Sequence, residues 1–127
     1  MDKAETYPNI DERCAHYASV IVSQRGTSKE AGALQTVIRN ALGVMREQGL
    51  YAFKLFVDYR AKIGGNLIWE QTRALWQDSV VGPLLSNAQN DLDGVRALTT
   101  DLNDLLLARE ITERMLIYAL YGLKATG

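Results

Sequence analysis

The feature that most constrains the fold is the spacing of apolar residues between glycine breaks. In residues 27–49, apolar side chains recur every three or four positions, the period of one face of an α-helix. These side chains are Leu34, Val37, Ile38, Ala41, Leu42 and Met45. No window alternates polar and apolar residues well enough for a strand, and two prolines in 127 residues favour long helices. The pattern predicts an all-α fold, a compact helical bundle of five to six helices.

Capping residues and glycines predict where these helices begin and end. We expect residues 1–8 to form a flexible N-terminal lead-in, and residues 9–127 to form a single helical-bundle domain. The first helix is expected to begin at Asn9, with Glu12 three residues later, and the second to begin with the capping box of Thr27 and Glu30. Glycines are expected to end these two helices, Gly26 the first and Gly49 the second. Later helices are expected at about 50–63, from a cap at Asn66 to the Gly82-Pro83 pair, at 90–98 and at 101–124, with a polar loop over 86–93.

Apolar stripes on the other helices predict the rest of the core. The predicted inward residues are Ile10, Cys14, Tyr17 and Ile21, then Leu50, Phe53, Phe56 and Val57, then Trp69, Trp76 and Val80. Residues 115–123 are apolar nearly all round. We therefore expect the long C-terminal helix to lie at the centre of the bundle.

The remaining composition limits the environment. Cys14 is the only cysteine, so an internal disulfide is impossible and a reducing, cytoplasmic location is expected. No apolar run approaches the roughly 18 residues of a membrane span, and the N-terminus has no apolar signal segment. The net charge of −1 is lower than is usual for a protein that binds nucleic acid alone.

Catalytic and metal-binding patterns are not found. Cys14 and His16 are two residues apart, which on a helix directs them to different faces. Asp91, Asp93 and Gly94 do not fit a calcium loop, because the first and last ligand positions carry the wrong residues. The other carboxylates are scattered, and no glycine loop for phosphate is present. We expect no enzyme, no cofactor and no metal site.

Basic residues offer one candidate surface. They lie on the second and third predicted helices and at the start of the second: Arg25, Lys29, Arg39, Arg46, Lys54, Arg60 and Lys62. If these helices pack as an antiparallel pair across Gly49, the cations could converge into a patch for phosphates. Alternatively they support their own helices through i, i+4 pairs: Lys54–Asp58, Asp58–Lys62 and Glu110–Arg114. Tyr51 and Tyr59 could stack on bases, or they could lie at the edge of the core or in an interface with another protein.

The order of the segments resembles the small subunit of type III-B CRISPR effector complexes, the Cmr small-subunit family. The resemblance is carried by an Arg-x-x-Gly-Leu corner that runs into an Ala-Phe helix, and by an aromatic-x-x-x-Leu-Lys ending. The residues are Arg46, Gly49, Leu50, Ala52 and Phe53, then Tyr118, Tyr121, Leu123 and Lys124. It covers about residues 10–124. The chain departs from the family in an extra Gly43 and in its slightly acidic charge.

The resemblance implies a non-catalytic, all-helical subunit of a multisubunit antiviral complex. Members of the family stack in several copies into a filament, beside backbone subunits that carry the guide RNA. Cleavage of target RNA belongs to the backbone subunits, and signalling belongs to the large subunit. A basic face lies along the target RNA. By position, the residues expected to contact the RNA backbone here are Arg25, Arg39, Arg46, Lys54, Arg60 and Lys62.

Two other functions stay open at this point. One is a helical protein–protein adaptor or scaffold that uses exposed aromatic and leucine residues and has no nucleic-acid contact. The other is a small helical hydrolase that uses a metal and carboxylates such as Glu47 and Glu70.

Overall fold

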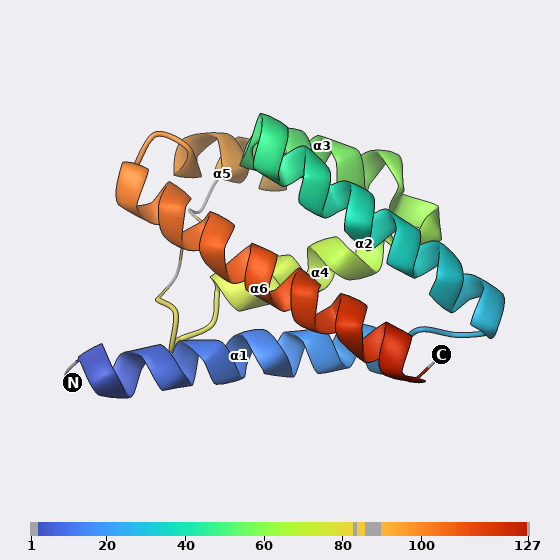
Figure 1. Cartoon of the computed structure of the whole chain (residues 1–127). Helices are drawn as coiled ribbons and strands as arrows, with labels where there is room; N and C mark the ends of the chain where they lie inside the picture. The colour runs from blue at the N-terminus through green and yellow to red at the C-terminus, as the bar shows by residue number, and fades with distance from the viewer. Residues whose placement is uncertain (1–2, 83, 86–89, 127) are drawn as a thin grey trace.

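The computed structural model describes the backbone of residues 3–82, 84–85 and 90–126, with side chains from residue 9 onward (Figure 1). Within these ranges the chain forms six α-helices, one 3-10 turn and no strand, which confirms the all-α prediction. The elements are α1 (Lys3–Ser23), α2 (Ser28–Gln48), α3 (Leu50–Tyr59), η1 (Ala61–Ile63), α4 (Gly65–Trp76), α5 (Asp91–Leu98) and α6 (Leu102–Thr126).

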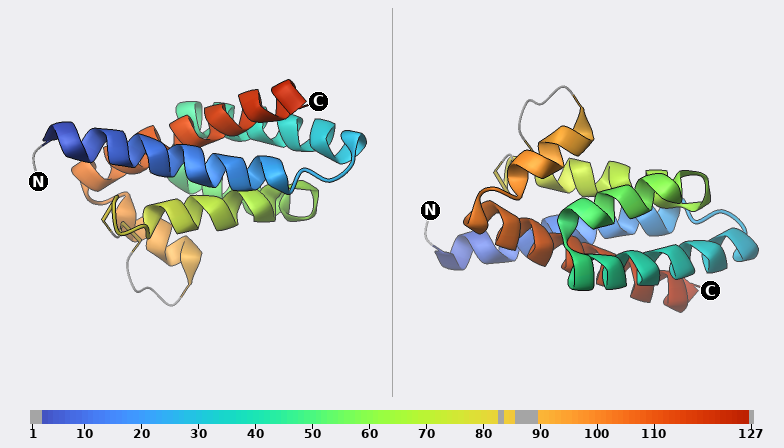
Figure 2. Two further views of the ribbon diagram at one scale, coloured as in Figure 1. Left: turned by 90° about the horizontal axis from the view of Figure 1, so that it is seen from below. Right: turned by 90° about the horizontal axis from the view of Figure 1, so that it is seen from above.

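The helices form a bundle in which α6 contacts α1, α2 and α4 (Figures 1 and 2). The first and last helices, α1 and α6, pack most extensively against each other. Helices α2 and α3 form an antiparallel pair, and α4 packs against α1 and α3. The short α5 packs against α3 at one end of the bundle. The contacts of α6 with three other helices agree with the predicted central position.

The second helix follows its sequence signals closely. The side chain of Thr27 accepts a hydrogen bond from the Glu30 backbone N–H, and Glu30 accepts from the Thr27 N–H, which is the predicted capping box. Gly49 ends α2 with φ +98°, a backbone conformation that favours glycine. Its N–H donates to the Met45 carbonyl at 3.0 Å, and its own carbonyl accepts from Phe53 at the start of α3. One glycine therefore ends one helix and begins the next.

The predicted start of the first helix is wrong. Helix α1 begins at Lys3 rather than at Asn9, and Pro8 lies within it. Inside a helix a proline removes one backbone donor and crowds the carbonyl four residues before it, here that of residue 4, yet the backbone stays helical through Pro8. So close to the start of a helix, one lost hydrogen bond does not end it.

The third helix ends earlier than the predicted 50–63. Helix α3 stops at Tyr59, and η1 leads to Gly64, whose φ is +114°. The predicted cap at Asn66 is wrong, because α4 already begins at Gly65 and has no side-chain cap. A side chain at position 65 would overlap the carbonyl oxygen of Val57, so the α3–α4 corner requires glycine there.

The fourth helix also ends early, at Trp76 rather than at Gly82. Asp78 is the cause: its carboxylate accepts a hydrogen bond from the Val80 N–H at 2.8 Å and also binds side chains of α1. These bonds compete with continuation of the helix. Val80 is consequently exposed, and its predicted place in the core is wrong. Pro83 and residues 86–89 of the predicted loop lie outside the described residues.

The core contains nearly all of the other predicted inward residues. All six predicted residues of α2 are buried, as are Cys14 and Ile21 of α1 and both tryptophans of α4. Trp76 donates to Thr112 Oγ1 of α6 at 2.8 Å, so its buried N–H is satisfied. Residues 115–123 are not buried all round, because Tyr118 and Tyr121 lie on an exposed side of α6.

The last two helices agree closely with their predicted ranges. Asn90 caps α5 by accepting from the Asp93 N–H at 2.8 Å, so residues 91–93 belong to a helix rather than to the predicted loop. Asp101 accepts from the Asp104 N–H at 3.0 Å, and α6 then runs from Leu102 to Thr126.

Candidate nucleic-acid interface

Arg46 is held by an acid on another helix. Its Nη2 and Nε donate to the same carboxylate oxygen of Glu113 on α6, at 2.7 and 3.1 Å. The pair is exposed, so a phosphate could still compete for the guanidinium. Arg46 therefore has a structural partner that the sequence reading did not assign to it.

Lys54 is a buried residue rather than a surface cation. Only 6% of it is exposed, although it forms the predicted i, i+4 ion pair with Asp58. Its Nζ also lies 4.5 Å from the centre of the Trp69 ring on α4, a cation–π contact. Lys54 links α3 to α4, and because it is buried it is not positioned to contact an RNA backbone at the surface.

Arg39 and Arg60 make no ion pair among the described residues. Arg39 is exposed on α2 and donates to Gln35 Oε1 at 3.4 Å. Arg60 follows α3 directly, and its guanidinium carbon lies 4.8 Å from the ring centre of Tyr59. Both cations keep donors available for a partner.

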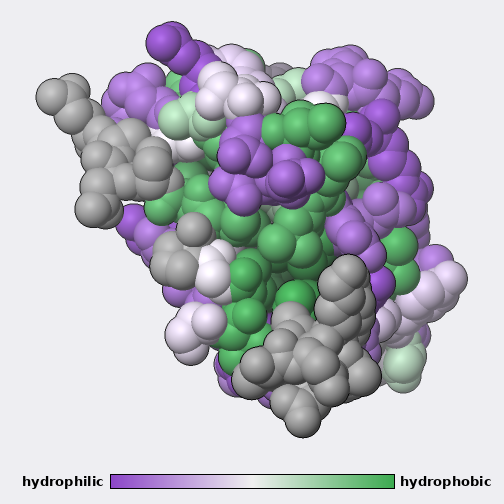
Figure 3. Space-filling model, turned by 90° about the vertical axis from the view of Figure 1, so that its left-hand side faces the viewer, coloured by the Kyte–Doolittle hydropathy of each residue, from purple (hydrophilic) through white to green (hydrophobic). Residues whose placement is uncertain are grey.

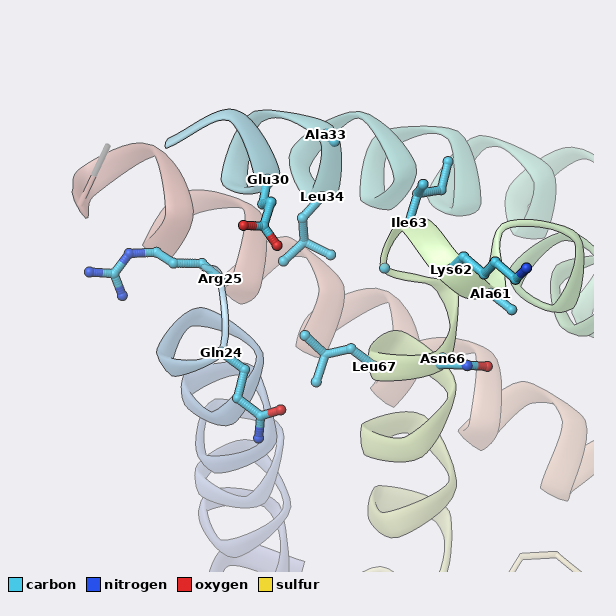
Figure 4. Close-up of a pocket in the computed structure, with 11 residues that line it drawn as sticks. Gln24, Arg25, Glu30, Ala33, Leu34, Ala61, Lys62, Ile63, Asn66 and Leu67 are labelled. Carbon is cyan, nitrogen blue, oxygen red and sulfur yellow. The ribbon is translucent and has the colours of Figure 1, made fainter. Parts of the chain in front are cut away.

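Arg25 and Lys62 border the same pocket, between the end of α1, the start of α2 and η1 (Figure 4). Leu34 and Leu67 point toward each other across it, whereas the two cationic groups point outward in different directions. Arg25 donates to the Val22 carbonyl at 2.9 Å. The pocket is lined by both leucines and polar groups, including the Glu30 carboxylate, and it does not direct two cations at one anion.

The six predicted cations do not form one continuous strip. Arg39 and Arg46 are seven residues apart on α2, on the flank that faces Glu113 of α6. Lys62 lies beyond the other flank of α2, next to Ala33 and Leu34. The condition for a patch is met, because α2 and α3 do form an antiparallel pair, but the pair has two sides and the cations are divided between them.

Tyrosines and carboxylates form a polar seam along α1, which the sequence reading missed. Asp11 accepts from Tyr118 Oη at 2.6 Å and from Arg114 at 3.3 Å, which joins α1 to α6. The hydrogen bond from Tyr118 to Asp11 raises the pKa of this tyrosine. The residues are more than 100 positions apart in the sequence, so no local pattern could indicate the contact.

Asp78 forms the second part of this seam. Its carboxylate, 10% exposed, accepts from Tyr17 Oη at 2.7 Å and from Arg13 Nε at 3.0 Å. Burial alone would raise the pKa of Asp78, but the hydrogen bonds from Tyr17 and the Val80 N–H, with the charge of Arg13, lower the pKa below 3.8. The seam fastens the segment after α4 to α1.

Cys14 and His16 lie in different surroundings, as their two-residue spacing on a helix predicted. Cys14 is fully buried and His16 is exposed. Burial raises the pKa of the Cys14 thiol to about 11, so the reactive thiolate is scarce near neutral pH. In the part of the chain that the structure describes, no group of three or more His, Cys, Asp or Glu side chains could hold a metal ion.

A row of apolar side chains on the outside of α3 was only partly predicted. Tyr51, Leu55 and Tyr59 are four residues apart and are 37%, 46% and 77% exposed; we call these three residues the outer face of α3. Tyr51 and Tyr59 were singled out from the sequence, but Leu55 was not. The signal was available, because α3 carries apolar residues on both sides of the helix.

A second exposed apolar surface lies where α6 begins. Leu102 and Leu106, one turn apart, are both exposed. Figure 3 shows hydrophobic residues gathered on this end of the molecule.

No protein-family model, curated protein or solved structure matches this chain. None of the helices in the described ranges is both long and apolar enough to cross a membrane.

Proposed function

We propose that this chain is a non-catalytic small subunit of a type III CRISPR RNA-guided effector complex. It would stack in several copies along the guide–target duplex and contact the target RNA backbone through exposed cations. The proposal rests on the resemblance of its motifs to the Cmr small-subunit family, and the all-α fold agrees with what that resemblance implies.

The observation that carries the proposal is the corner at Gly49. The motif residues divide there into two groups: Leu50 and Phe53 are fully buried, whereas Arg46 is exposed. The closing motif divides in the same way, with Leu123 buried and Lys124 exposed. Both motifs thus combine a buried apolar framework with an exposed cation, although Arg46 is engaged by Glu113 and would present its charge to RNA only after leaving that acid.

The structure narrows the residues that we propose for RNA contact. Arg25, Arg39, Arg60 and Lys62 form no ion pair among the described residues, so their positive charge is available. Arg46 would have to leave Glu113, and Lys54 is buried. The remaining contacts would be to phosphates and independent of sequence. With a net charge of −1, the chain would bind RNA more weakly alone than within the complex, so binding by the chain alone is best measured at low salt.

Purification of the tagged chain from its native cells tests this proposal. We expect short RNAs that share a common end sequence to copurify, together with backbone proteins and a large subunit. Charge reversal of Arg39 and Lys62 should weaken target-RNA binding by the purified complex and reduce the slope of affinity against salt. Arg96→Glu, at an exposed cation on α5, is the matched control. A preparation that contains neither such RNAs nor such proteins would refute the assignment.

A helical adaptor without nucleic-acid contact is the second candidate. The outer face of α3 favours it, because Leu55 places an apolar side chain between two exposed tyrosines. Protein partners that copurify after complete RNase digestion, from a preparation that never contained guide RNA, would select this function over the first.

A further inference from the structure

The outer face of α3 presents aromatic rings next to positive charge. Exposure increases along the helix from Tyr51 to Tyr59, and Tyr59 is the most exposed of the large apolar and aromatic side chains that the structure describes. Tyr51 and Tyr59 are separated by eight residues, or about 12 Å along the helix axis. This is longer than the roughly 3.4 Å between stacked neighbouring bases, so the two rings could not serve adjacent stacked bases.

Arg60 lies close to two aromatic rings at the end of this face. Its guanidinium carbon lies 4.8 Å from the Tyr59 ring centre and 5.8 Å from the Phe56 ring centre. Stacking on aromatic rings leaves the outward edge of a guanidinium group able to donate hydrogen bonds. Among the described residues no acid pairs with it. An aromatic plane and an available cation therefore stand side by side.

The segment formed by α3 and η1 carries a net positive charge, although the whole chain does not. Residues 50–63 contain three cations, Lys54, Arg60 and Lys62, against one acid, Asp58. Asp58 is engaged by Lys54, which leaves Arg60 and Lys62 uncompensated within the segment. This local excess favours an anionic partner over a neutral one.

We infer that the outer face of α3 binds unpaired RNA nucleotides. Tyr59 stacks on a base, and Arg60, whose guanidinium carbon lies 4.8 Å from the Tyr59 ring centre, contacts a flanking phosphate. This inference rests on the proposed function, from which it takes RNA as the partner. An aromatic ring beside a cation matches a base beside its phosphate, the combination that single-stranded nucleic-acid sites use. An acidic protein would use the charge but has no comparable need for the exposed ring.

Direct binding by the purified full-length chain tests the site. The probes are a fluorescent 12-nucleotide oligo(A) RNA and an abasic RNA of equal length, measured by anisotropy at low salt. We expect Tyr59→Ala to weaken oligo(A) binding by about 5- to 100-fold while leaving abasic RNA unchanged. Tyr59→Trp should retain binding, and Arg60→Ala should weaken binding of both RNAs. The control is Leu106→Ala on α6, an exposed apolar side chain outside both family motifs, which should change neither.

Several results would overturn the inference. Equal losses for oligo(A) and abasic RNA after Tyr59→Ala would show that the ring does not stack on bases. Loss of copurifying proteins with unchanged RNA binding would assign the face to a protein partner. Failure of the purified chain to bind either RNA would also remove the site. That failure is distinct from failure of the proposed function, which depends on the RNAs and subunits that copurify from cells.

Discussion

The seam along α1 and the outer face of α3 contain similar residues, but these residues have different roles in the two regions. In the seam, Tyr17 and Tyr118 each donate to a carboxylate that also binds an arginine. On α3, Tyr59 and Arg60 contact each other, and no carboxylate accepts from either one among the described residues. Tyrosine and arginine thus fasten helices together in one region and remain available in the other.

The difference lies in where the acids are. Asp11 and Asp78 come from elements that face the tyrosines across a helix contact, so polar groups that lose water gain partners. The one acid of α3, Asp58, is engaged by Lys54 within the same helix. A cluster of tyrosine and arginine therefore indicates a binding surface only where the neighbouring acids are already occupied.

The largest effect is expected from Asp78→Ala in the seam. This change leaves the Tyr17 hydroxyl and the Arg13 guanidinium without their shared acceptor, and it should lower the free energy of unfolding by about 3 kcal/mol. Urea denaturation followed by circular dichroism measures it. If Asp78→Ala costs no more than Tyr59→Ala, the distinction between the two regions fails.

Acid should reproduce this loss in the unaltered chain. The pKa of Asp78 is lower in the folded state than its ordinary value of 3.8, so its contribution to stability is fully present above that value. As pH falls, the unfolded state binds a proton first, and the contribution is lost as pH passes through the folded pKa. Unfolding curves should therefore show a smaller penalty for Asp78→Ala at pH 3 than at pH 7. An unchanged penalty would contradict the assigned role.

A smaller loss is expected within α3 itself, from Lys54→Ala. Removal of the buried stem and of the contact with Trp69 should cost about 2 kcal/mol. Lys54→Met retains most of the stem, so comparing it with Lys54→Ala separates the stability that comes from packing from the stability that comes from the charge. Lys62→Ala, on an exposed cation, is the control and should change stability by less than about 0.5 kcal/mol. Equal effects at positions 54 and 62 would mean that Lys54 is not buried in solution.

The Arg46–Glu113 pair should contribute still less. Exposed ion pairs stabilise proteins by about 0.5 kcal/mol, so a double-mutant cycle with Arg46→Ala and Glu113→Ala should give a coupling energy of this size. The coupling should decrease in 1 M salt. A coupling energy several times larger would show that Arg46 is held by its acid as firmly as the arginines of the seam, and it would argue against Arg46 as an RNA contact.

The smallest effect on stability is expected on the outer face of α3. Tyr59→Ala and Arg60→Ala should each change the free energy of unfolding by less than about 0.5 kcal/mol, because both side chains lie outside the core. Thermal unfolding by calorimetry provides the measurement. A loss above 1 kcal/mol for either variant would show that the face is structural rather than available.

The sequence predicted the features that depend on neighbouring residues. The capping box of Thr27 and Glu30, the buried stripe of α2 and the corner at Gly49 are local, and each was predicted correctly. Of the i, i+4 pairs considered, Lys54–Asp58 and Glu110–Arg114 are present. Asp58–Lys62 is not among the ion pairs of the described residues, because α3 ends at Tyr59 and helical spacing stops there.

Features that depend on distant residues were not predictable. The early end of α4 follows from Asp78, which binds α1 more than 60 positions away. The burial of Lys54 requires Trp69, and the partner of Arg46 lies on α6. Spacing on a single helix shows which cations share a side, but it does not show whether another helix supplies an acid to that side. For this reason the sequence identifies the candidate cations but does not predict how they are arranged on the folded surface.

The glycine at position 65 has a consequence for finding relatives of this chain. Charged residues on helix surfaces are replaced freely during evolution, whereas a position whose first side-chain carbon would overlap the Val57 carbonyl cannot change unless the whole corner opens. Distant homologues should therefore keep a glycine between a short aromatic-rich helix and a tryptophan-bearing one, even after their arginines have diverged. Aligning candidate sequences on that glycine is a better guide to common ancestry than matching their basic residues.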